Sequence, residues 1–183
     1  TAAEIGLNHQ ETSPISAAVL VVAVAGNVAY EYAKAVPVLG NAVFGAMIAL
    51  CYYFGLVFMR PELGFAELAS AQHLTLFVAI ALTNSTMTYF TYFKDREGDR
   101  LAGKHTLVVV LGVQRAAKLG WLMALLPFAA LAPLAPTLAW HGWLLAFAAF
   151  AIALRTAWLY FKDPVGLRTY LNLAWAFRAC VCF

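Results

Sequence analysis

Long uninterrupted runs of apolar residues constrain this chain more than any other feature of its sequence. Five such runs follow one another, at residues 14–32, 38–59, 73–93, 119–134 and 138–161. A transmembrane helix needs about 20 mostly apolar residues, and each run approaches or exceeds that length. A sixth run begins near residue 167 and continues to the end of the sequence. The pattern predicts an all-α fold, a multi-spanning transmembrane helix bundle.

The composition excludes an ordinary soluble domain. Of the 183 residues, 63% are hydrophobic and only 11% are charged, whereas soluble domains carry about 25% charged residues. A water-facing surface could not be built from so few polar groups, but a lipid-facing one could. The net charge of +3 is small, and its basic residues lie between the apolar runs. We therefore expect the lipid bilayer, and not nucleic acid, as the chain's surroundings.

The connections between the runs alternate in charge. Basic residues concentrate around Lys34, in the stretch 94–118 and in the stretch 155–168, while the connections between them hold few or none. Loops rich in Lys and Arg remain on the cytoplasmic side of a membrane. We therefore expect a multi-pass protein of the cell inner membrane, with residues 94–118 as a cytoplasmic loop. Arg178 falls inside the sixth run, where an intramembrane charge is expected to face the bundle interior.

The two ends of the chain suggest that it is part of a longer protein. It begins at Thr1 without a methionine, and it ends at Phe183 within an apolar run. We therefore interpret residues 1–183 as a single transmembrane domain that is incomplete at the N-terminus and at the C-terminus.

The most polar segment, residues 93–106, contains the residues best suited to chemistry. Asp95 and Asp99 are four positions apart, so a continuing helix would place both on one face, one turn apart. Mg²⁺ commonly takes one or two protein carboxylates and completes its shell with water and substrate phosphates. Arg100 and Lys104 could contact the phosphate oxygens. The alternative is a charged loop that acts only as a topology signal.

Three strings in the chain resemble motifs of the UbiA-type intramembrane prenyltransferases. The string DREGDRLAGKHTLVVVLG, residues 95–112, resembles the second aspartate-rich motif of that family. Tyr30 and Lys34 fit the family's Y-x-x-x-K motif at the end of its fourth helix, and the stretch from Pro37 to Asn41 resembles the start of its fifth. The resemblance covers most of the chain and implies helices four to nine of a nine-helix fold.

The chain also departs from the family's pattern. The first aspartate-rich motif is absent, and in the family it would lie upstream of residue 1. Many members carry an Arg-Glu and a Lys-Asp pair before the second motif, where this chain has Met87, Thr88, Thr91 and Tyr92. These departures leave the class of acceptor open.

The resemblance implies a Mg²⁺-dependent transferase that moves a prenyl group from an allylic polyprenyl diphosphate to a lipophilic acceptor. The acceptor would be a quinone precursor, a glycerol phosphate ether or a chlorophyllide. The residues that would act with a metal are Asp95 and Asp99 as its ligands, with Tyr30 and Lys34 as further catalytic residues. The residues that would bind the diphosphate are Lys34, Arg100, Lys104, Asn41 and Asn84. Without the first motif, the isolated chain is expected to be inactive.

A transporter or channel without enzymatic activity is the alternative. Its motivation is the apolar composition together with polar residues such as Asn84 inside a span. Transporters tend to contain internal repeats, and no clear repeat is visible in this sequence. The aromatic residues Tyr89, Phe90 and Tyr92 leave a second choice open, because such rings could stabilise an allylic cation or simply contact lipid.

Overall fold

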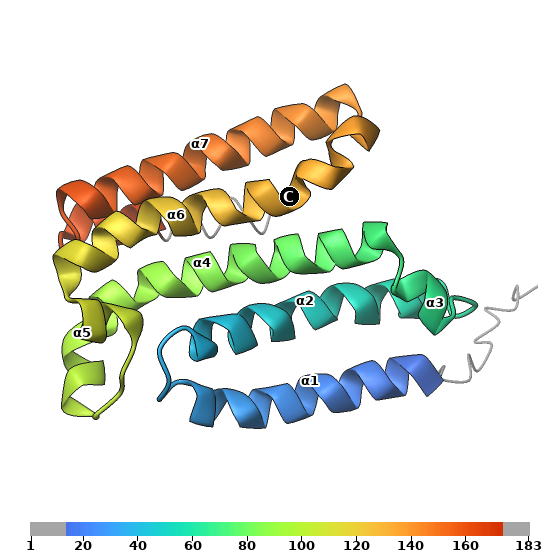
Figure 1. Cartoon of the computed structure of the whole chain (residues 1–183), viewed down its shortest axis with the longest axis horizontal. Coiled ribbons are helices and arrows are strands. Elements are labelled where there is room, and N and C mark those ends of the chain that lie inside the picture. Colours follow the sequence, from blue (N-terminus) through green and yellow to red (C-terminus); the bar gives the residue numbers. More distant parts are fainter. Residues whose placement is uncertain (1–13, 174–183) are drawn as a thin grey trace, which may run out of the picture.

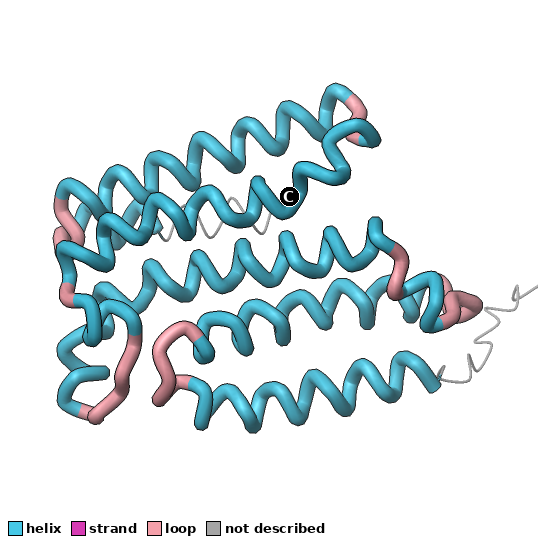
Figure 2. Tube along the Cα trace, in the orientation of Figure 1, coloured by secondary structure: helices cyan, strands magenta, loops and turns pink. Residues whose placement is uncertain are grey.

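A computed structural model of the chain describes residues 14–173 (Figures 1 and 2). Its elements are α1 (Pro14–Ala33), α2 (Leu39–Met59), α3 (Phe65–Leu68), α4 (Ala71–Leu101), α5 (Leu107–Leu111), α6 (Val113–Leu131), the 3-10 helix η1 (Ala132–Thr137) and α7 (Trp140–Lys162). Residues 167–173 begin a further helix. The described part of the chain contains no strand, so the predicted all-α fold is confirmed.

Five helices are long and apolar enough to cross a membrane. They coincide with the five predicted runs, with one instructive difference. The sequence predicts a loop at residues 94–118, but α4 continues as a helix to Leu101 and α6 already begins at Val113. Lys, Arg and Glu are good helix formers, and the single interior Gly98 costs the helix only about 1 kcal/mol. The charged end of α4 is therefore a rigid extension of a membrane span.

The long helices pack in sequence order, each against the next, as the side-by-side ribbons of Figure 1 show. Because consecutive helices run in opposite directions, the connections 34–38, 102–112 and 163–166 meet at one end of the bundle. We call this the basic end. Within the described residues, Arg60 is the one Lys or Arg that belongs to the opposite end. The helix arrangement and the charge distribution therefore agree on which connections share a side.

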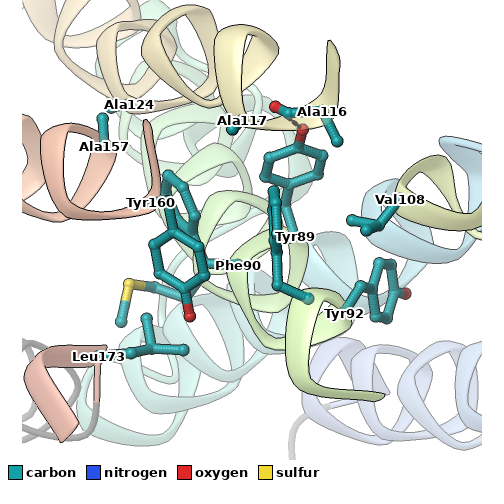
Figure 3. Close-up of a cluster of buried hydrophobic side chains, with 12 residues drawn as sticks. Tyr89, Phe90, Tyr92, Val108, Ala116, Ala117, Ala124, Ala157, Tyr160 and Leu173 are labelled. Carbon is teal, nitrogen blue, oxygen red and sulfur yellow. Dashed lines mark hydrogen bonds between the residues drawn. The ribbon is translucent and has the colours of Figure 1, made fainter. Parts of the chain in front are cut away.

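The main core lies where α4, α6 and α7 meet (Figure 3). Small residues of α6, including Ala116 and Ala117, are fully buried and let the rings of α4 approach closely. The Tyr89 hydroxyl donates a hydrogen bond to the Ala116 carbonyl at 2.5 Å. Phe90 packs on Tyr160 of α7 with ring centroids 4.7 Å apart. Tyr89 and Phe90 are therefore buried in the core of the bundle.

A second, polar seam joins α2 to α4. Gly45 of α2 lies so close to α4 that a Cβ there would be 2.1 Å from the Ala81 carbonyl oxygen. One turn earlier, Asn41 and Ser85 hydrogen-bond across the same seam. Small residues and interhelical hydrogen bonds are typical of helix contacts in membranes. The seam fixes α2, and with it the turn that carries Lys34, beside the charged end of α4. Arg178 and most of the sixth run lie outside the described residues.

Candidate functional site

A polar cleft of about 290 Å³ opens at the basic end of the bundle. It lies between α1, α2, the charged end of α4 and the segment that follows α4. Its lining residues are Tyr30, Lys34, Phe44, Thr88, Thr91, Tyr92, Asp95, Asp99, Lys104 and Thr106. The cleft therefore gathers acidic and basic side chains from three separate parts of the chain.

The two acidic residues of the cleft come from the last turns of α4. Because α4 remains helical to Leu101, Asp95 and Asp99 lie one turn apart on the same face. The Asp95 side chain is 50% exposed, while that of Asp99 is only 10% exposed. Asp99 is the inner carboxylate of the pair, and Asp95 faces the mouth of the cleft.

The turn after α4 folds a lysine back toward the inner carboxylate. The Lys104 backbone N–H donates to the Asp99 carbonyl at 2.9 Å, and the Lys104 Nζ lies 3.3 Å from Asp99 Oδ1. The turn passes through Gly103, whose φ of 68° lies in the left-handed region, where a side chain would be strained. This glycine therefore permits the reversal that brings Lys104 over the acid pair.

The second lysine of the cleft, Lys34, follows directly on α1. Its Nζ lies 4.4 Å from the centroid of the Tyr30 ring and 2.7 Å from a carboxylate oxygen of Glu31. Tyr30 in turn packs against Phe44 of α2, with ring centroids 5.5 Å apart. Phe44 thus holds the Tyr30 ring in place, and the cation–π contact of that ring orients Lys34.

Neutral side chains form the wall of the cleft on α4. Thr88, Thr91 and Tyr92 precede the acid pair on the same helical face. Tyr92 reaches toward α2, because its hydroxyl oxygen lies 3.4 Å from the position that a Cβ at Gly40 would take. The spacing of three and four residues from Thr88 through Asp99 is the signal in the sequence that assigns this wall, because such positions share one face of a helix.

Two further cleft residues were not singled out by the sequence. Phe44 sits inside an apolar run and carries no chemical signal. Thr106 lies two positions after Lys104, in the string that resembles the second aspartate-rich motif. Its own position in that string was the only available clue.

Three of the predicted diphosphate-binding residues lie outside the cleft, and their role in binding diphosphate stays a prediction. Asn41 is 3% exposed, and its side-chain amide donates to the Ser85 carbonyl. Asn84 donates to the Ile80 carbonyl of its own helix, and its eleven-residue separation from Asp95 corresponds to roughly 16 Å along α4. The Arg100 side chain is 63% exposed and pairs with Glu97 at 3.0 Å.

Each of these three residues lies outside the cleft for a physical reason. A buried amide inside a membrane span must find a hydrogen-bond partner, and a backbone carbonyl is the nearest acceptor. Arg100 follows Asp99 directly, so it points about 100° away around the helix axis. Tyr30, Lys34, Asp95, Asp99 and Lys104, by contrast, all line the cleft as a group.

The two carboxylates of the cleft fit a magnesium ion whose remaining ligands come from water and substrate. Within residues 14–173, no group of three or more His, Cys, Asp or Glu side chains could hold a metal by itself. Two carboxylates one turn apart are nevertheless the usual protein share for Mg²⁺, which keeps water and phosphate oxygens as its other ligands. The two lysines that line the same cleft match the negative charge of such phosphates. The site therefore suits a metal–diphosphate complex better than a bare ion.

Comparison with known proteins gives one match. A family model described as the UbiA prenyltransferase family matches residues 5–177 of the chain. No curated protein and no solved structure matches it. The matched region includes every residue of the cleft.

Proposed function

Because the chain belongs to the UbiA prenyltransferase family, we propose that the cleft at its basic end binds the diphosphate of an allylic polyprenyl donor through Mg²⁺. In this proposal the prenyl group is transferred to a lipophilic acceptor in the membrane. The observation that carries the proposal is the meeting of Asp95, Asp99, Lys34 and Lys104 in one cleft. Family membership also favours an enzyme over the transporter or channel considered from composition.

The roles proposed for these residues follow from their charge and exposure. Asp95 and Asp99 would hold the metal, with Asp95 toward the mouth and Asp99 inside. Bound Mg²⁺ would neutralise the negative charge that develops on the leaving diphosphate. Lys34 and Lys104 would bind the non-bridging phosphate oxygens. Tyr30 would orient Lys34 through its ring.

The reaction breaks the bond between C1 of the prenyl chain and the diphosphate oxygen, and the diphosphate leaves with the electron pair. The acceptor forms the new bond to C1 and releases a proton. The neutral wall of Thr88, Thr91 and Tyr92 borders the acid pair on α4. Its uncharged groups leave quinone precursors, glycerol phosphate ethers and chlorophyllides all open as acceptors.

The proposed orientation of the chain in the membrane rests on charge. Five apolar helices and family membership make the chain an integral membrane protein. We propose that the basic end faces the cytoplasm, following the positive-inside rule, and that the membrane is the cell inner membrane. Because this sequence contains one acid pair and the family resemblance implies a second, turnover is not expected from residues 1–183 alone.

The experiment that tests the proposal compares acidic residues of the same helix end in the full-length protein. Asp95→Asn and Asp99→Asn each remove a carboxylate from the cleft, whereas the matched control Glu97→Gln removes one that pairs with Arg96 and Arg100 outside it. Diphosphate release from prenyl diphosphates of several lengths is measured with a panel of acceptors, with and without Mg²⁺. We expect a loss of at least about 100-fold in the two aspartate variants and near-normal release in the control. Normal Mg²⁺-dependent turnover in the Asp95→Asn/Asp99→Asn double variant would refute the proposal.

A further inference from the structure

The hydroxyl group of Thr106 is buried without a hydrogen-bond partner. Thr106 is 4% exposed, and within residues 14–173 its Oγ1 is the one buried side-chain oxygen or nitrogen that lacks a partner. Buried polar groups are almost always hydrogen-bonded, and an exception calls for an explanation. A hydroxyl already removed from water is a group prepared for a partner that arrives later.

The local backbone gives this hydroxyl no structural role. Thr106 occupies the N-cap position of α5, with φ −62° and ψ 155°. A threonine there normally accepts a hydrogen bond from a backbone N–H of the first helical turn, but no side-chain cap bond is formed. Its nearest charged neighbour in sequence, Lys104, directs its Nζ to Asp99 instead. The turn after α4 and the start of α5 therefore form without a hydrogen bond from the Thr106 Oγ1.

The position of the residue indicates what the partner is. Thr106 lines the same cleft as Asp95, Asp99, Lys34 and Lys104. A ligand that suits two lysines and a metal-binding acid pair carries several anionic oxygens, and these are acceptors for an O–H donor. Rotation about the Cα–Cβ bond moves the hydroxyl to another staggered position, so the donor can turn toward such a ligand without movement of the backbone.

We propose that the Thr106 hydroxyl donates a hydrogen bond to a phosphate oxygen of the bound diphosphate and thereby fixes its orientation beside Lys104. This inference rests on the proposed function of the cleft and adds a substrate-contacting residue to it. Because the hydroxyl is unsatisfied before binding, the ligand gains the contact without displacing a protein partner. The contact is to the diphosphate head, so it is independent of the length of the prenyl chain.

The test compares Thr106→Val, which keeps the shape and removes the hydroxyl, with Thr106→Ser, which keeps the hydroxyl and removes the methyl. Binding of a non-reactive prenyl thiolodiphosphate to the full-length protein is measured by calorimetry in Mg²⁺, together with the melting temperature without ligand. We expect Thr106→Val to weaken binding about tenfold and to melt at or above the wild-type temperature, because an unsatisfied buried group is removed. Thr106→Ser should bind within about threefold of wild type.

Competition by inorganic diphosphate gives a second, more local measurement. Thr106→Val should raise the inhibition constant of diphosphate by the same factor as that of the thiolodiphosphate, while the affinity for the prenyl alcohol stays unchanged. Wild-type affinity of Thr106→Val for both diphosphates would overturn the inference. So would equal weakening in Thr106→Val and Thr106→Ser, which would assign the loss to packing.

The same data separate this inference from the function on which it depends. If the wild-type protein does not bind the thiolodiphosphate in Mg²⁺, the proposed function itself fails, and the inference fails with it. If the wild type binds and Asp95→Asn does not, while Thr106→Val binds normally, the proposed function stands and the role of Thr106 alone is refuted.

Discussion

Asn41 on α2 and Ser85 on α4 exchange two hydrogen bonds across the interface of their helices. The Asn41 side-chain amide donates to the Ser85 carbonyl at 3.1 Å, and the Ser85 hydroxyl donates to the Asn41 carbonyl at 2.8 Å. Both residues are buried. The pair therefore fixes the register of α2 on α4 and, through the turn before α2, the height of Lys34 relative to the acid pair.

Removal of this pair should destabilise the bundle. We expect Asn41→Ala to lower the free energy of unfolding by about 1 kcal/mol, the size found for hydrogen bonds between membrane helices. Ser85→Ala removes the second bond, since each acceptor is a backbone carbonyl that alanine retains. In a double-mutant cycle the two losses should be less than additive, because both bonds hold the same helix contact and the loss of one weakens the other. Denaturant titration in detergent measures the three variants.

Asn84→Ala is the matched control, since that amide bonds only within α4, and it should change stability by less than about 0.5 kcal/mol. Additive losses from Asn41 and Ser85 would contradict the coupling.

The close approach of α2 to α4 leads to a second prediction about stability. A Cβ at Gly45 would lie 2.1 Å from the Ala81 carbonyl oxygen and 2.2 Å from Ser85 Oγ, so Gly45→Ala must push the helices apart. We expect a loss of about 1–3 kcal/mol, as for other overpacked sites. Gly55→Ala is the control on the same helix, because no atom lies within 4 Å of its Cβ position. That variant should be neutral or stabilising by up to about 1 kcal/mol through helix propensity. Equal behaviour of the two variants would contradict the close approach.

The fold could be predicted from the sequence because a bilayer leaves few choices. A long apolar run in lipid must satisfy its backbone internally, so the five runs had to become helices. The helical structure at the charged end of α4 was harder to predict from the sequence, because a run of charged residues after an apolar span is typical of a loop. Five of the eight residues 94–101, the Lys, Arg, Glu and Leu residues, are strong helix formers, and the chain reverses only at Gly103, where the backbone turns left-handed.

The group of residues that lines the cleft could be predicted in part. Asp95 and Asp99 were assigned to one face from their spacing, and the motif resemblance added Tyr30 and Lys34. For a polar residue inside a span, however, sequence does not reveal which carbonyl it will reach. Asn41 bonds to a neighbouring helix and Asn84 to its own, whereas the Thr106 hydroxyl has no hydrogen-bond partner within the described chain.

The positions of Lys104 and Arg100 predict opposite effects of two similar substitutions. Lys104 lines the cleft beside Asp99, whereas Arg100 pairs with Glu97 outside it. Lys104→Gln in the full-length protein should therefore raise KM for the prenyl diphosphate about tenfold, the loss of one charged phosphate contact. Arg100→Gln should leave KM within about twofold. Initial rates over a range of donor concentrations measure both, and an equal rise in the two variants would show that only the overall positive charge of this end matters.

The ring of Tyr30, rather than its hydroxyl, should hold Lys34 in the cleft. The Lys34 Nζ lies 4.4 Å from the ring centroid, and such contacts contribute about 0.5–1 kcal/mol at exposed sites. Tyr30→Leu should therefore weaken Mg²⁺-dependent binding of diphosphate about two- to fivefold, because Lys34 loses its support and pairs more freely with Glu31. Tyr30→Phe keeps the ring and the packing on Phe44, so it should bind like the wild type. If Tyr30→Phe were as weak as Tyr30→Leu, the hydroxyl of Tyr30 would have to carry the effect, and the cation–π role would be wrong.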